Sequence, residues 1–162
     1  FADSGAVGST DTTAFGFRYT TEAAGSSITI GGATATTEAT TTDKDSQNLG
    51  IKVVNGNLSF SLSQGTEEAA DEDQEHTGAA ISYKMGNGMT IGAYTVDGED
   101  ALDAGEEYTS SGVEVQYTIA SGLTAVVIVE DYEYKAPTTA DSNGTTTGDS
   151  GTNSRLVIKA SF

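Results

Sequence analysis

The feature that most constrains this chain is a period-two alternation of apolar and polar residues that recurs along its length. In residues 57–65, for example, Leu58, Phe60 and Leu62 are separated by serines. Successive side chains of a strand point to opposite faces, so the pattern predicts strands with one apolar and one polar face. Nine such segments can be recognised, at about residues 13–21, 26–36, 47–55, 57–65, 77–86, 88–97, 110–120, 122–134 and 153–162. The segment 122–134 is the least regular, because Val126 and Ile128 make both of its faces apolar.

The connections between these segments alternate between short and long. The short ones contain glycine, which supplies the positive φ of tight hairpins, and they lie at 23–26, 55–57, 86–88 and 121–122. The long ones are polar, and they cover about 37–46, 66–76, 98–109 and 135–152, with the carboxylates clustered in the second and third of them. Short turns on one side and long loops on the other are typical of transmembrane barrels. The sequence therefore predicts an all-β fold, an antiparallel up-and-down transmembrane β-barrel with about nine strands present.

Composition excludes several other classes of protein. The chain of 162 residues has a formal net charge of −17 and no cysteine, and the acidic balance argues against nucleic acid as a partner. No apolar stretch reaches the roughly 18 residues that a transmembrane helix needs. Low hydrophobicity with high charge is also the signature of disorder, but the carboxylates gather between the alternating segments, which a disordered chain would not require. A soluble or cell-surface acidic β-sandwich, such as an adhesive domain, remains the main alternative.

The end of the chain, residues 154–162, resembles the last strand of Gram-negative outer-membrane porins. That strand ends in Phe, here Phe162, with apolar residues at alternate positions before it. Residues 80–94 and 112–129 also resemble porin hairpins, of the type found in α-proteobacteria and marine bacteria. The resemblance implies a passive channel for small hydrophilic solutes and ions, embedded in outer-membrane lipid and assembled as a homotrimer. It also implies that the barrel assembly machinery recognises Phe162.

Porins of this kind usually have 16 strands and are about twice as long as this chain. The resemblance therefore implies that residues 1–162 are the C-terminal portion of a single barrel, with further strands upstream. If the last strand ends in the periplasm, all four short turns are periplasmic. Residues 1–12 would then be an extracellular segment preceding a descending strand.

Charged and amide side chains on the polar faces are the candidate pore-lining residues. A charge facing lipid at mid-membrane costs about 2–4 kcal/mol, so cations within strands are expected to face a water-filled lumen. We expect a basic track along this lumen that opposes acidic loops. The candidates are Arg18, Lys52, Lys84, Glu114, Gln116, Arg155 and Lys159.

Aromatic residues on the apolar faces suggest a membrane-interface girdle. Tyr19, Tyr83, Tyr117 and Phe162 all fall near the tight-turn ends of their segments. Amphipathic rings favour this level of the bilayer.

Metal binding and catalysis find little support in the sequence. Asp97, Glu99 and Asp100 are weak candidate ligands for a loop-bound calcium ion, but they do not fit a calcium-loop template. The single histidine, His76, lies in an acidic stretch, and an outer-membrane enzyme that uses it would need partners from other strands. We therefore expect no catalytic residues and no cofactor.

Overall fold

The fold is described from a computed structural model, which places residues 11–38, 43–69, 72–100, 106–136 and 147–160. Nine strands form in these ranges: β1 (Asp11–Ala23), β2 (Ser26–Glu38), β3 (Lys44–Asn55), β4 (Leu58–Ala69), β5 (Glu72–Lys84), β6 (Met89–Asp100), β7 (Glu106–Ala120), β8 (Leu123–Lys135) and β9 (Asp149–Ala160). The described ranges contain no helix that is long and apolar enough to cross a membrane.

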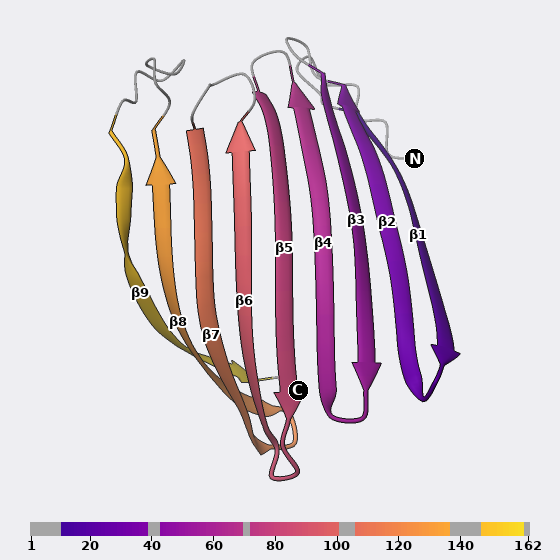
Figure 1. Ribbon diagram of the computed structural model, residues 1–162, viewed down its shortest axis with the longest axis vertical. Helices are drawn as coiled ribbons and strands as arrows, with labels where there is room; N and C mark the ends of the chain where they lie inside the picture. Colours follow the sequence, from indigo (N-terminus) through magenta and orange to yellow (C-terminus); the bar gives the residue numbers. More distant parts are fainter. Residues whose placement is uncertain (1–10, 39–42, 70–71, 101–105, 137–146, 161–162) are drawn as a thin grey trace.

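The strands form one antiparallel sheet in which each strand pairs with its neighbours in sequence, in the order β1 to β9. Figure 1 shows this meander as a curved sheet with the tight turns at one end. The register is continuous through every pair except β7 and β8, where it shifts between Thr118 and Ala120. The predicted all-β, up-and-down architecture is therefore confirmed.

The strands extend further toward the loop end than the sequence pattern predicts. β4 continues to Ala69 and β5 begins at Glu72, so most of the expected loop 66–76 is strand. Likewise, much of the expected loop 98–109 belongs to β6 and β7. The acidic residues of these stretches continue the backbone pairing of their strands. A polar composition does not by itself prevent backbone pairing. Asp11 and Thr12, expected in an extracellular segment, are the first residues of β1, and residues 1–10 lie outside the described ranges.

The tight turns follow the expected chemistry. At the first turn both Ala24 and Gly25 have positive φ, of 50° and 77°, as a two-residue hairpin of type I′ requires. A left-handed conformation is uncommon for alanine, because its Cβ approaches the following carbonyl oxygen. This turn is therefore formed despite the alanine, and the hydroxyl pair of Thr20 and Thr29, with their Oγ1 atoms 3.0 Å apart, joins the strands above it.

The two faces of the sheet differ sharply. One face, called here the apolar face, carries two or more large apolar side chains on every strand, and these side chains form a continuous apolar belt. Most are exposed, from 71% for Phe15 to 38% for Ile91. Leu49, Ile81, Tyr83, Tyr117 and Ile158 are exposed, Ile51 and Val115 are half-buried, and Phe162 lies outside the described residues. A β-sandwich would instead pack these residues against a second sheet.

The opposite face, called here the polar face, is the more crowded one. Among the described residues, the side chains of Val126, Ile128, Ser110 and Asp100 are less than a tenth exposed, and all four point to this face. Side chains crowd together on the inside of a curved sheet and spread apart on its outside. The polar face is therefore the concave one, and the small apolar cluster at Val126 and Ile128 lies on it.

The apolar belt crosses the sheet obliquely. On β1 the belt is centred at Phe17, and on β9 it is centred at Ile158. Following the register from Phe17 across the sheet leads to Ser150, eight residues before Ile158 and eight strand-to-strand steps away. A shift of one residue per strand, with strands about 4.8 Å apart and about 3.3 Å per residue, corresponds to strands tilted by about 35° from the normal to the belt.

Candidate functional site

The concave polar face is the candidate functional surface. It carries all seven residues predicted to line a pore: Arg18 on β1, Lys52 on β3, Lys84 on β5, Glu114 and Gln116 on β7, and Arg155 and Lys159 on β9. Their shared face follows from the register, because residues paired across antiparallel strands point to the same side. The structure thus places these residues together on one surface, while their pore-lining role stays a prediction.

The charges of this face are divided between two sectors. Arg18, Lys52 and Lys84 project from β1–β5 and form no ion pair with a described residue. On β6–β9 the described carboxylates are more numerous than the cations, and they are Asp100, Glu106, Glu114, Glu130 and Asp149, against Arg155 and Lys159. The basic track along a lumen stays a prediction. Arg18, Lys52 and Lys84 share the polar face of β1–β5 with Glu22 and the Lys44–Glu67 pair, and Arg155 and Lys159 do not extend this group. They lie on the acidic side.

Two ion pairs join neighbouring strands near the loop end of the sheet. Lys44 Nζ lies 2.5 Å from a Glu67 carboxylate oxygen on the polar face. Lys135 Nζ lies 2.6 Å from Glu107 Oε2 on the apolar face, beyond the belt. Lys135 is the one cation of the seven in the chain that lies on the apolar face, and it is placed where an interface rather than hydrocarbon is expected.

The polar face also carries four tyrosines that the sequence analysis did not single out: Tyr94 on β6, Tyr108 on β7, and Tyr132 and Tyr134 on β8. The Tyr94 hydroxyl donates to Glu130 Oε2, two strands away. Its ring reaches there across Gly112, where an added Cβ would lie 2.8 Å from the hydroxyl. Tyr132 similarly crosses Gly151 of β9 and donates to Asp149 Oδ2 over 3.2 Å.

Parity within the strands could have revealed these tyrosines. Tyr94 has the parity of Thr90 and Gly92, opposite to the apolar Ile91 and Ala93. Tyr132 likewise lies three positions after the apolar Val129, and an odd offset along a strand puts it on the opposite face. Tyr19, Tyr83 and Tyr117 do lie at the turn-side edge of the belt, as expected for an interfacial girdle, although Phe162 lies outside the described ranges.

The three weak metal candidates do not all lie on one face. Asp97 and Glu99 pair within rows of the apolar face, whereas Asp100 pairs within a row of the polar face. Adjacent residues of one strand cannot converge on a single ion from opposite faces. Among the described residues, no group of three or more histidine or acidic side chains has the geometry of a metal site.

His76 lies on the polar face, where its ring covers Gly65 together with the side chain of Asn48. Neither Gly65 nor Asn48 has a side chain that could act as a nucleophile beside His76. Residues 66–76 were expected to form a loop, but His76 lies within β5 and is exposed.

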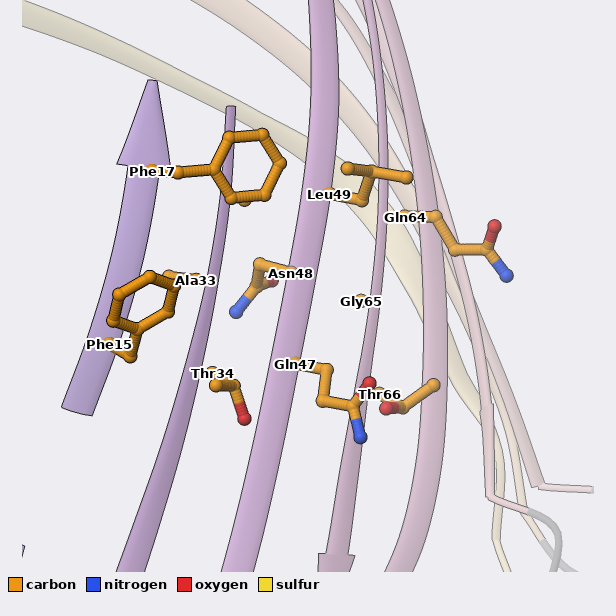
Figure 2. A pocket seen from close by; sticks show the side chains of 11 residues that line it. Phe15, Phe17, Ala33, Thr34, Gln47, Asn48, Leu49, Gln64, Gly65 and Thr66 are labelled. Atoms are coloured by element: carbon orange, nitrogen blue, oxygen red, sulfur yellow. The ribbon is translucent and has the colours of Figure 1, made fainter. Parts of the chain in front are cut away.

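A hollow lies on the apolar face of β1–β4, with a volume of about 410 Å³. Figure 2 shows Phe15 and Phe17 on one side of it and Leu49 and Gln64 on the other. The Phe17 ring lies over Gly32, where an added Cβ would come within 2.9 Å of it. Because this hollow is on the exposed convex face, at the loop-side edge of the belt, it is separate from the polar surface described above.

Comparison with solved structures relates this arrangement to one class of protein. The structure is similar to the anion-selective porin from Comamonas acidovorans, with a TM-score of 0.65 over 92% of this chain. The fold is that of a porin wall. The two sequences are 17% identical, and the chain spans about half, 49%, of the length of that porin. No protein-family model matches the sequence, and no curated protein matches it either.

Proposed function

We propose that this porin-like sheet forms about half of the wall of an outer-membrane channel for passive diffusion of small hydrophilic solutes and ions. The observation that carries the proposal is the assignment of the two faces. A concave face of charges, hydroxyls and glycines suits a water-filled lumen, and a convex belt of exposed apolar side chains suits lipid. The tilt of about 35° inferred from the belt agrees with the 35–45° of such barrels.

The edges of the sheet support completion by further strands. In the described ranges β1 and β9 are each paired on one side only. Unpaired backbone groups inside hydrocarbon cost several kcal/mol each, so strands span membranes only as closed barrels. We infer that other strands of the same protein pair with β1 and β9 and close a barrel of about 16 strands.

The remaining expectations follow from this proposal. The channel would reside in the bacterial outer membrane, with the belt in contact with lipid, and would associate as a homotrimer. The assembly machinery would recognise the last strand through Phe162. The soluble adhesive alternative is disfavoured because that class of protein would expose an apolar belt to water without a partner. The porin-like fold likewise indicates a channel rather than an outer-membrane enzyme.

Single-channel recording tests the proposal. The full-length protein, purified from the outer membrane in detergent and added to a planar bilayer in 1 M KCl, is expected to insert in discrete conductance steps. In liposome swelling, small sugars should enter faster than larger ones, as diffusion through a water-filled lumen requires. Well-folded protein that migrates faster on a denaturing gel before boiling, yet gives neither steps nor swelling, would contradict a channel.

A further inference from the structure

The four tyrosines of the polar face form a patch, called here the tyrosine patch, that the proposed channel function does not by itself explain. Three of them surround Ser110, which is only 4% exposed. Tyr108 lies two residues before Ser110 on β7, and Tyr132 is the register partner of Ser110 on β8. Tyr94 on β6 is the register partner of Gly112, two residues after Ser110. The tyrosines are therefore packed around a buried side chain at the base of the patch.

Two of the rings lie across a neighbouring strand of the wall. Tyr94 and Tyr132 each extend over a glycine of the next strand and are fixed at the far end by a hydrogen bond to a carboxylate, Glu130 and Asp149 respectively. A ring that lies along the wall presents one π-face to the lumen. Because both rings are restrained on two sides, a solute that stacks on them would order few additional side-chain torsions.

A hollow of about 250 Å³ adjoins the patch on the same face. Tyr108 borders it, and the ring is 41% exposed. Its other borders include Gln74, His76, Asp100 and Glu106, and its base is formed at Gly98, whose register partners are His76 and Tyr108. A space of this volume accommodates a small organic molecule next to an aromatic ring.

The charge around the patch decides the class of molecule. Four carboxylates that point to the polar face border the patch and the hollow, those of Asp100, Glu106, Glu130 and Asp149, and Arg155 is close enough to Tyr94 to interact with it electrostatically. Aromatic π-faces attract cations, most strongly quaternary or other weakly hydrated ammonium groups. An anion would be repelled, and a neutral sugar would gain nothing from the excess of negative charge.

We propose that the tyrosine patch and its hollow bind small organic ammonium cations of the choline type during their passage along the wall. The inference rests on the proposed function, since it takes the polar face to be the lumen. Anions would meanwhile favour the basic sector on β1–β5, and potassium would pass through the open lumen. The channel wall would then contain a binding site that is selective for one class of solute, although the channel as a whole would be weakly selective.

Saturation-transfer NMR on the full-length protein in detergent at pH 8 tests the binding without relying on conductance. Choline is the probe, and 3,3-dimethyl-1-butanol, which has the same shape without the charge, is the matched control ligand. Choline should receive saturation and compete with tetramethylammonium, and the neutral alcohol should bind at least about threefold more weakly. Equal binding of the two would overturn the proposal, and so would binding of maltose in preference to choline.

Variants of Tyr108 test the site, because this ring makes no described hydrogen bond that a substitution would break. Tyr108→Leu removes the π-face and should weaken choline binding by about threefold to tenfold, whereas Tyr108→Phe should retain it. Tyr117→Leu, on the belt, is the control and should change nothing. If Tyr108→Leu binds choline as tightly as the unsubstituted protein, the assigned site is wrong.

The same proteins in planar bilayers distinguish the two proposals. Choline at millimolar concentration should reduce the potassium current of the unsubstituted channel, and less so after Tyr108→Leu. A channel that conducts but shows no choline binding in NMR would end the inference and leave the proposed function standing. Choline binding by a protein that never conducts would end the proposed function instead.

Discussion

Ile81→Arg is expected to lower the free energy of unfolding of the full-length protein in lipid by about 2–4 kcal/mol. Ile81 is the middle residue of the apolar belt on β5, between Ala79 and Tyr83, and is 48% exposed on the convex face. In a bilayer that exposure means contact with hydrocarbon, where a guanidinium loses its water without gaining a partner. Equilibrium unfolding in urea, followed by tyrosine fluorescence and by gel migration, measures the change.

The neighbouring residue provides the matched control. Ser82 follows Ile81 on the same strand and points to the polar face, where its register partners are Ser59 and Gly92. Ser82→Arg should cost much less, since its charge would stay in water and its neighbours are small. If the two arginines destabilise the protein equally, Ile81 does not face lipid and the assignment of the faces is wrong.

Removal of the basic sector is expected to shift ion selectivity toward cations. A unit charge about 10 Å from an ion in water contributes about 0.4 kcal/mol before screening, and it acts with opposite sign on potassium and chloride. The triple variant Arg18→Gln, Lys52→Gln, Lys84→Gln should therefore raise the potassium-to-chloride permeability ratio by about threefold. The reversal potential under a tenfold KCl gradient measures this ratio.

Lys135→Gln is the control for that experiment. Lys135 carries the same charge but lies on the apolar face, paired with Glu107. Its substitution should leave the reversal potential unchanged. A shift of similar size for both variants would show only a general effect of net charge at the channel mouth, and an absent shift for the triple variant would show that these side chains do not line the conducting path.

The sequence predicted the architecture because period-two alternation and glycine turns are local signals. Leu58, Phe60 and Leu62 specify a face without reference to any other strand, and Asn55-Gly56-Asn57 specifies a hairpin without reference to the faces. The weak point of the pattern, Val126 and Ile128, was also informative. These residues do point to the polar face, where they form the small buried cluster of the described chain.

The strand ends and the tyrosine patch were not predictable in the same way. Glu67, Glu68 and Asp73 place polar side chains on both faces of the sheet, so the apolar–polar alternation ends before them. Nothing in the sequence pattern therefore shows that β4 and β5 stay paired as far as Ala69 and Glu72. The patch depends on which glycine lies beside which tyrosine, and that depends on register across strands. Tyr94 and Gly112 are 18 residues apart in sequence but adjacent in the sheet.

The most direct test of the account is whether modification of alternate residues changes the current. These 162 residues contain no cysteine. Single cysteines can therefore be introduced at Ser61, Leu62, Ala80, Ile81, Ser82 and Tyr83 of the full-length protein, after any cysteine elsewhere in it has been replaced. A charged, membrane-impermeant thiol reagent should change the single-channel conductance at Ser61, Ala80 and Ser82. It should leave the conductance unchanged at Leu62, Ile81 and Tyr83. A response that does not alternate along β5, or one confined to the apolar face, would contradict a wall whose concave polar face lines the channel.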